Sequence, residues 1–343
     1  MQRVAANGPA PSGAEAVPWV MGGEYQVDEF DLAWLLGGLM KRRHSAFTFR
    51  SVLAAVCLTC VGVWVLAAQE PGGVVAADKR VQGRSYVFAD TGEKMPYALF
   101  VPSNYDASKK WPLIVGLHGA GRPYDWLMGY DGIIDFAQRD GFIMVTPLGY
   151  RALGGFGSPR TPRRVAAAPA TPAPLPPGRN AAQAEALARE AESLPPNISE
   201  LSEKDVMNVF AIVRKEFNID ENRIYLWGHS MGGGGTYHLA AKYPDIWAAL
   251  AVAAPGPAAK LEQLERFKNT PILVLQGDAD RTVLPAGTRN TVAQMKQLGM
   301  ECVYVEVKGG DHSLFISKNR DTLAKVFAFF NIVQKNQRAA QTN

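Results

Sequence analysis

A serine between two glycines is the feature of this sequence that most plainly could do chemistry. The segment GHSMG at residues 228–232 fits the pattern G-x-S-x-G, with an apolar run before it and a helical pattern after it. A turn this sharp between a strand and a helix exposes the serine hydroxyl on a strained backbone and needs small neighbours. We therefore expect Ser230 to be a nucleophile, with Gly228 and Gly232 clearing the space around it. The further glycines at 233–235 are expected to let the helix approach the sheet closely.

A serine hydroxyl needs a base to remove its proton. The chain has five histidines, which are His44, His118, His229, His238 and His312. The first lies in a targeting-like segment, the second and third lie in the motifs LHGAG and GHSMG, and His238 is expected to be a packing or surface residue. His312, in the loop KGGDHSLF after the last apolar run, is the predicted base.

The base in turn needs a carboxylate that fixes its tautomer and stabilises its protonated form. The segment LQGDADRTVLP offers Asp278 and Asp280 after an apolar strand. We favour Asp280 because it lies further out on the loop, and Asp278 remains the alternative. Asp311 is less suitable, since adjacent side chains rarely point at each other. The order serine, aspartate, histidine along the chain is that of the α/β-hydrolase fold.

Acyl transfer also needs hydrogen-bond donors for the oxyanion that develops on the substrate. The backbone N–H of Met231, directly after the nucleophile, is one predicted donor. The second is predicted in the loop LHGAGRP, with the N–H of Ala120 favoured over that of Gly119. Three aromatic side chains of nearby loops are candidates for lining the substrate pocket, namely Tyr124, Trp126 and Tyr150.

Short apolar runs alternate with helical patterns from about residue 84 onward, which indicates a mostly parallel sheet covered by helices. The runs predict strands at 84–90, 96–102, 112–119, 142–148, 223–230, 247–254, 271–278 and 301–310, and helices at 202–217, 234–243 and 317–333. Ser202, with Asp205 three residues later, is the predicted N-cap of the first of these helices. We expect one catalytic domain over residues 84–335.

A Pro- and Ala-rich segment at 160–196 interrupts this pattern. Its composition cannot supply a packed strand, so we expect a flexible surface insertion with one short helix near 181–192. Whether the insertion is a linker or a lid over the substrate is left open.

The amino-terminal region has the pattern of a targeting signal. Residues 40–68 combine a basic start, an apolar run at 51–68 and small residues at the end, as in a secretory signal. The apolar run is also just long enough to span a bilayer, so an uncleaved anchor is the alternative. Either form sends the downstream domain outward, to a secreted or periplasmic location. We expect translation to begin at Met40, which makes residues 1–39 an over-extended or disordered terminus.

Composition and charge limit the classes of partner that this protein is expected to bind. The net charge is only +4, and no dense basic block with aromatics occurs in the main domain, so nucleic-acid binding is not expected. The protein is expected to bind a membrane only if the apolar run at 51–68 is not cleaved off and stays as an anchor. Cys57 and Cys60 are interpreted as small apolar residues of the targeting segment, and Cys302 has no cysteine partner in the main domain. No cofactor and no metal is expected.

The sequence resembles a family of secreted α/β-hydrolases described as polyhydroxybutyrate depolymerase-like, feruloyl-esterase-like or dienelactone-hydrolase-like esterases. The resemblance rests on PLIVGLHGAG, on residues 202–251, on PILVLQGDADRTVLPAGTR and on GGDHSLF. It covers nearly all of the chain from Tyr97 onward, and it implies a single-domain α/β-hydrolase with the triad Ser230, Asp280 and His312. The long Pro/Ala insertion and the lack of a cysteine pair in the main domain depart from the family.

These observations lead to the expectation of an exported serine carboxylic-ester hydrolase that works through an acyl-enzyme on a small-molecule or polymer ester. A serine peptidase of the prolyl-oligopeptidase type, or an acyltransferase, could use the same triad, although nothing here resembles the propeller domain of such peptidases. A non-enzymatic binding protein is disfavoured because the serine, aspartate and histidine are all present.

Overall fold

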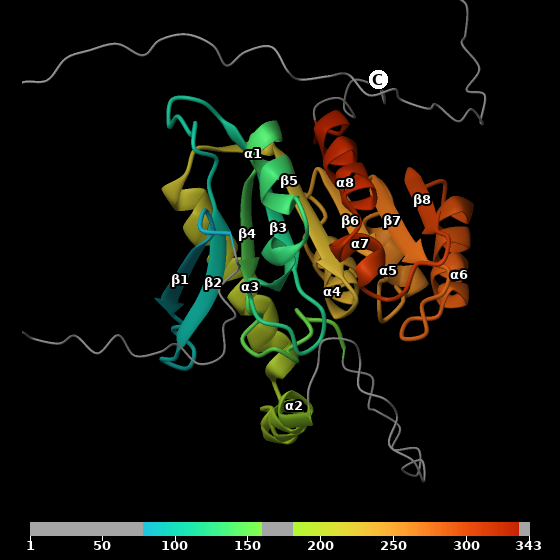
Figure 1. The fold of residues 1–343 in the computed structure, drawn as a ribbon, viewed down its shortest axis with the longest axis horizontal. Coiled ribbons are helices and arrows are strands. Elements are labelled where there is room, and N and C mark those ends of the chain that lie inside the picture. Colours follow the sequence, from blue (N-terminus) through green and yellow to red (C-terminus); the bar gives the residue numbers. More distant parts are fainter. Residues whose placement is uncertain (1–77, 160–180, 336–343) are drawn as a thin grey trace, which may run out of the picture. The chain divides into compact units, whose positions relative to one another are not determined.

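The computed structural model describes residues 78–159 and 181–335. Its centre is an eight-stranded sheet with the order β1-β2-β4-β3-β5-β6-β7-β8 (Figure 1). The strands are β1 (Gln82–Val87), β2 (Lys94–Phe100), β3 (Trp111–Leu117), β4 (Ile143–Pro147), β5 (Ile219–His229), β6 (Ala249–Ala253), β7 (Ile272–Gly277) and β8 (Cys302–Val307). β2 runs antiparallel to both of its neighbours, and all pairs from β4 to β8 are parallel.

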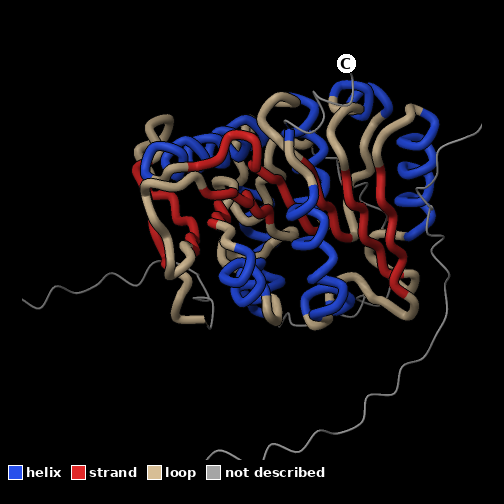
Figure 2. Tube along the Cα trace, turned by 90° about the horizontal axis from the view of Figure 1, so that it is seen from above, coloured by secondary structure: helices blue, strands red, loops and turns tan. Residues whose placement is uncertain are grey.

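Helices cover both faces of the sheet (Figure 2). On one face lie α1 (Ile133–Asp140), α8 (Arg320–Ile332) and the short helices η1 (Trp126–Gly129) and α7 (Leu314–Ser317). On the other face lie α3 (Ile198–Glu216), α4 (Met231–Lys242), α5 (Leu261–Arg266) and α6 (Pro285–Gln297). The alternation of side chains along β5 shows why both faces are apolar. Tyr225 and Trp227 enter the core beneath α1 and α8, whereas Ile224 and Leu226 enter the core beneath α3 and α4.

The predicted mostly parallel sheet flanked by helices is confirmed, and each predicted strand is present within a few residues of its expected bounds. The prediction for the start of α3 is wrong. The helix begins at Ile198 with Asn197 before it, so Ser202 lies inside the helix and is not an N-cap. Its hydroxyl instead accepts a hydrogen bond of 2.8 Å from the backbone N–H of Phe156.

The glycine run at the start of α4 is explained by close approach, although the partner differs from the expected sheet. A Cβ at Gly233 would lie 2.7 Å from Pro255 Cα, and one at Gly234 would lie 2.5 Å from Pro257 Cδ. A Cβ at Gly235 would lie 2.6 Å from Phe156 Cβ. Residues 233–235 thus allow the helix to pack on the loop after β6 and on the loop after β4.

The short helix expected near 181–192 is present as α2 (Ala181–Ser193). Its Glu190 accepts a hydrogen bond of 3.0 Å from the N–H of Leu153, which ties the helix to the loop after β4.

Several predictions lie outside the described residues, including the terminus at 1–39, the signal or anchor at 40–68, Cys57 and Cys60, and residues 160–180 of the insertion. Among the helices that the structure describes, none is both long and apolar enough to cross a membrane.

Candidate active site

The three residues expected to do chemistry meet at the carboxyl ends of parallel strands. Ser230 follows β5, Asp280 follows β7, and His312 follows β8. Loops at this edge of a parallel sheet converge, which is why ligand sites form there.

Ser230 has a backbone conformation that a residue with a side chain rarely adopts, with φ 56° and ψ −116°. Its N–H donates to Ala253 O at 2.9 Å, and its carbonyl oxygen accepts from Gly256 N at 2.9 Å, so the loop after β6 holds the turn. The glycines on either side are sterically required. A Cβ at Gly228 would lie 2.0 Å from the carbonyl oxygen of Gly232, and one at Gly232 would lie 2.1 Å from that of Leu117. Holding such a conformation costs about 1–3 kcal/mol, and it exposes the hydroxyl.

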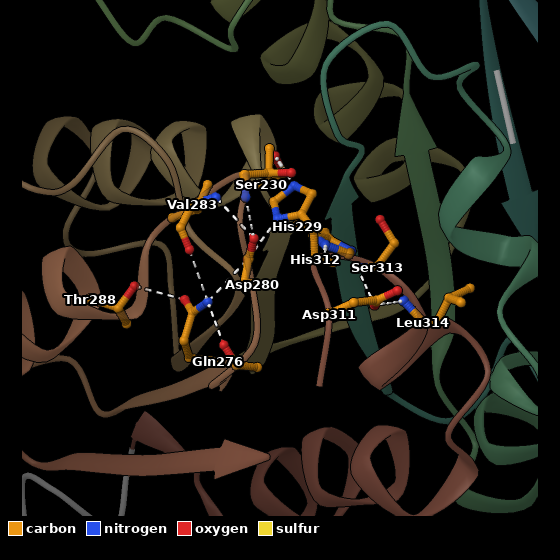
Figure 3. Close-up of polar contacts among 12 residues, drawn as sticks. His229, Ser230, Gln276, Asp280, Val283, Thr288, Asp311, His312, Ser313 and Leu314 are labelled. Carbon is orange, nitrogen blue, oxygen red and sulfur yellow. Dashed lines mark hydrogen bonds and ion pairs between the residues drawn. The ribbon is translucent and has the colours of Figure 1, made fainter. Parts of the chain in front are cut away.

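The Ser230 hydroxyl begins a series of hydrogen bonds that runs through His312 to Asp280 (Figure 3). His312 Nε2 lies 2.9 Å from Ser230 Oγ, and His312 Nδ1 lies 2.7 Å from Asp280 Oδ2. Because a carboxylate only accepts, Nδ1 carries the proton and Nε2 is left to accept from the serine hydroxyl. This is the tautomer in which the imidazole can take the serine proton.

Asp280 is built to stay ionised. Its side chain is fully buried, Oδ1 accepts from the N–H of Thr282 at 2.7 Å and of Val283 at 3.0 Å, and Oδ2 also accepts from Gln276 at 3.0 Å. Burial acts to raise the pKa of this carboxyl, but the hydrogen bonds from His312, Val283 and Thr282 outweigh it and hold the pKa below its ordinary value.

The two alternative carboxylates have other partners. Asp278 Oδ1 accepts from the N–H of Gly309 at 2.6 Å and so joins the β7 and β8 loops. Asp311 Oδ1 accepts from the N–H groups of Ser313 and Leu314 at 2.9 and 2.6 Å (Figure 3). Of the three candidates, Asp280 is therefore the one that the structure places against His312.

His229 is a residue whose role the sequence reasoning missed. Its Nε2 lies 2.8 Å from the backbone carbonyl oxygen of His312, and its Nδ1 contacts the hydroxyl of Tyr130. A carbonyl only accepts, so Nε2 carries the proton and Nδ1 accepts from Tyr130. Burial, with a smaller effect from His312, lowers the pKa of His229 to about 3, so the ring is neutral. The sequence could have indicated this position. Side chains alternate between the two faces along β5, so His229, two residues after Trp227 and four after Tyr225, is expected on the same face as these two residues.

The loop predicted to supply an oxyanion donor lies beside the serine. A Cβ at Gly119 would be 3.6 Å from Ser230 Cβ. Met231 is the first residue of α4, so its N–H has no acceptor within the helix. The backbone N–H groups of Met231 and Ala120 stay our predicted donors.

The loop after β4 supports the loop after β3. The buried ring of His118 has its Nε2 2.8 Å from Leu148 O and its Nδ1 2.8 Å from Gly119 O, and burial lowers its pKa. The N–H of Gly121 donates to Ala152 O at 2.8 Å. The segment 148–152 therefore fixes the position of residues 118–121.

A buried carboxylate on α3 anchors that supporting segment. Asp205 accepts hydrogen bonds from the N–H of Gly149 at 2.7 Å, the N–H of Tyr150 at 2.9 Å and the hydroxyl of Tyr86 at 2.7 Å. Burial raises the pKa of Asp205, although the three donors act in the opposite direction.

The three aromatic candidates for substrate contact lie in different places. Trp126 is adjacent to the site, since a Cβ at Gly119 would lie 3.4 Å from its ring and its centroid is 5.2 Å from that of His229. Tyr124 belongs to the buried cluster beneath α1 and α8. Tyr150 is buried, with its ring 5.5 Å from that of Phe88 and its hydroxyl 2.8 Å from Glu93.

Metal-ligating side chains do not gather in groups of three or more within the described residues.

The strand order and the strained serine turn are those of the α/β-hydrolase fold class, and this chain has that fold. Within that class, residues 206–337 match the family described as PET hydrolase-like, and this span contains Ser230, Asp280 and His312.

Curated relatives cover shorter stretches. Cutinase 1 of Thermobifida cellulosilytica is 33% identical over 95 residues, which are 27% of this chain and 34% of that protein. A probable SOBER1-like carboxylesterase of Arabidopsis thaliana is 32% identical over 117 residues, which are 32% of this chain and 45% of that protein. The chain thus matches less than half of the length of either relative.

Solved structures share the fold over more of the chain. A thermostable esterase has a TM-score of 0.51 at 23% identity and covers 75% of this chain and 64% of its own. A ferulic acid esterase of Anaeromyces mucronatus has a TM-score of 0.51 at 16% identity, and the match covers 74% of this chain and 90% of the esterase chain. An S-formylglutathione hydrolase of Agrobacterium tumefaciens has a TM-score of 0.52 at 17% identity, and the match covers 73% of this chain and 94% of the hydrolase chain.

Proposed function

We propose that this protein is an exported serine hydrolase of carboxylic esters. The observation that carries the proposal is the hydrogen-bonded series Ser230–His312–Asp280 on a strained strand-to-helix turn. The partial matches to cutinases, to a carboxylesterase and to the PET hydrolase-like family support an ester as substrate, either a small molecule or a polymer.

In the proposed reaction, His312 Nε2 takes the Ser230 proton while Oγ attacks the ester carbonyl carbon. The N–H groups of Met231 and Ala120 stabilise the oxyanion that forms on the carbonyl oxygen. His312 then returns the proton to the leaving alcohol, which gives an acyl-serine. Water, deprotonated by the same histidine, then attacks the acyl carbon, and the histidine returns this proton to Ser230 Oγ as the bond to Oγ breaks and the acid is released. Asp280 stabilises the imidazolium in both half-reactions.

The test uses p-nitrophenyl esters of short and long acids together with methyl ferulate. We expect turnover by the wild-type protein and a loss of roughly 10³-fold or more in Ser230→Ala and His312→Ala. The exposed serine variant Ser103→Ala is the matched control and should keep full activity. Cleavage of proline-containing peptides with no ester turnover would instead support a peptidase.

A further inference from the structure

An arginine lies beside the candidate site without a carboxylate partner among the described residues. Arg122 lies near the end of the predicted oxyanion loop LHGAGRP, where its N–H donates to Gly119 O at 3.1 Å and closes a turn over residues 119–122. Its side chain is partly buried, and its guanidinium carbon lies 5.1 Å from the centroid of the Trp126 ring.

The Trp126 ring connects this guanidinium to the nucleophile. A Cβ built on Gly119 would lie 3.4 Å from the Trp126 ring and 3.6 Å from Ser230 Cβ, so the ring and the nucleophile lie on either side of this glycine's side-chain position. The same ring packs 5.2 Å from His229, the neighbour of the nucleophile. The Trp126 ring thus contacts both the Arg122 guanidinium and His229, the residue before Ser230.

A partly desolvated cation without an anion is unfavourable, and stacking on an aromatic ring offsets only a part of that cost. Two other partly buried arginines have carboxylate partners. Arg84 pairs with Glu216 at 2.7 Å, and Arg151 pairs with Glu93 at 2.7 Å. Burial lowers the pKa of Arg122, but a guanidinium remains charged at neutral pH.

We infer that Arg122, held against Trp126, binds the carboxylate of an anionic substrate, so that the site favours esters carrying a carboxylate over neutral esters of the same shape. The inference rests on the proposed ester hydrolysis. A guanidinium presents paired N–H donors that match the two oxygens of a carboxylate, and its attraction strengthens where water is excluded.

Two other arginines provide controls. Arg223 is also partly buried and lies over an aromatic ring, Phe142, but it belongs to the part of β5 remote from Ser230. Arg281 follows Asp280 directly and is exposed, so it is the competing candidate for an anion contact. Each substitution to Gln removes one positive charge, as Arg122→Gln does.

The experiment compares kcat/KM for two matched ester pairs, using the full chain. The pair 4-acetoxybenzoate and 4-acetoxybenzamide places the charge on the leaving group. The pair monomethyl terephthalate and methyl 4-carbamoylbenzoate places it on the acyl group. We expect the wild type to favour the anion of at least one pair by roughly 10- to 100-fold. Arg122→Gln should remove this preference and leave the neutral ester within about threefold, whereas Arg122→Lys should keep part of it.

Several results would overturn the inference. They are a wild type with no preference for either anion, an equal loss for both members of a pair in Arg122→Gln, or a preference that disappears in Arg281→Gln or Arg223→Gln instead. These outcomes leave ester hydrolysis intact if the neutral esters are still cleaved. Absence of turnover of all four esters would count against the proposed ester hydrolysis. Anion binding by Arg122 is then tested separately, by isothermal titration of 4-acetoxybenzoate into Ser230→Ala and into Ser230→Ala/Arg122→Gln. Equal binding by the two variants would reject it.

Discussion

His312 is held from two sides besides the serine. Asp280 fixes its ring through Nδ1, and His229 donates to its backbone carbonyl. The hydrogen bond that Nδ1 of His229 accepts from Tyr130 depends on a neutral ring, because a protonated ring has no acceptor, whereas Nε2 can donate to the His312 carbonyl in either state. The residue next to the nucleophile therefore helps to place the base, and it does so at a pKa far from the ordinary value for histidine.

This shift predicts a loss of stability in acid. The folded-state pKa of His229 is about 3, against 6.5 for the unconstrained side chain, so the unfolded chain binds the proton more readily. Stability from this residue is fully present above pH 6.5 and is lost as pH falls from 6.5 toward 3. Between pH 7 and pH 4.5 the loss amounts to roughly 2–3 kcal/mol.

Urea unfolding of the wild type and of His229→Gln at the two pH values measures this contribution. The titratable groups around His229 are Tyr130, His312, Asp280 and Arg122, and all are the same in both proteins. We expect a smaller acid-induced loss in the variant, and equal losses would refute the assignment.

At the scale of elements, α4 reaches the end of β3 only because Gly232 has no side chain. Its Cβ would lie 2.1 Å from Leu117 O, a backbone atom that cannot move aside cheaply. We expect Gly232→Ala to destabilise the fold by roughly 3 kcal/mol and to abolish esterase activity by displacing Ser230. Gly287→Ala in α6 is the control, because nothing lies within 4 Å of its Cβ, and it should stabilise by about 0.5–1 kcal/mol. Chemical denaturation measures the free energy of unfolding of both variants. Similar changes in the two would show that the close approach of Gly232 to Leu117 is not the cause of the destabilisation.

The anchor from α3 to the loop after β4 gives a second prediction. Removing Asp205 leaves two buried N–H donors and the partly buried Tyr86 hydroxyl without this acceptor, so Asp205→Ala should cost roughly 3 kcal/mol and lower kcat through the loop at 118–121. Asp205→Asn should cost much less, because its oxygen can face the N–H groups of Gly149 and Tyr150 while its amide donates to Tyr86. An Asn variant as damaged as the Ala variant would indicate that the charge, rather than the acceptor, is required.

The sequence predicted elements best where one periodicity dominates. Continuous apolar runs identified the parallel strands, because both of their faces are buried. Helices α1 and α6 were not predicted, since their apolar stripes are short and interrupted by polar residues. Ser202 was misread because a serine followed by an acid suggests a cap, whereas its hydroxyl satisfies the backbone of a distant loop. Such long-range partners cannot be recognised from local sequence.

At the scale of the whole molecule, the proposal includes export of the catalytic domain from the cytoplasm, which rests on the pattern at residues 40–68. We predict that translation begins at Met40 and that the exported protein begins near Gln69. Intact mass and amino-terminal sequencing of the protein from the extracellular or periplasmic fraction test this. Recovery of a chain that begins at Met1 from the cytoplasm would contradict it, and a full-length membrane-bound form would favour the anchor.

The most direct test of the account is to locate the covalent bond that the proposed mechanism requires. The wild type, Ser230→Ala and His312→Ala are treated with a fluorophosphonate, and the modified peptide is identified by mass spectrometry. We predict a single phosphonylated residue, Ser230, with no labelling in Ser230→Ala and labelling slowed by roughly 10³-fold or more in His312→Ala. A wild-type protein that is not labelled, or is labelled at another serine, would contradict the assignment of Ser230 as the nucleophile.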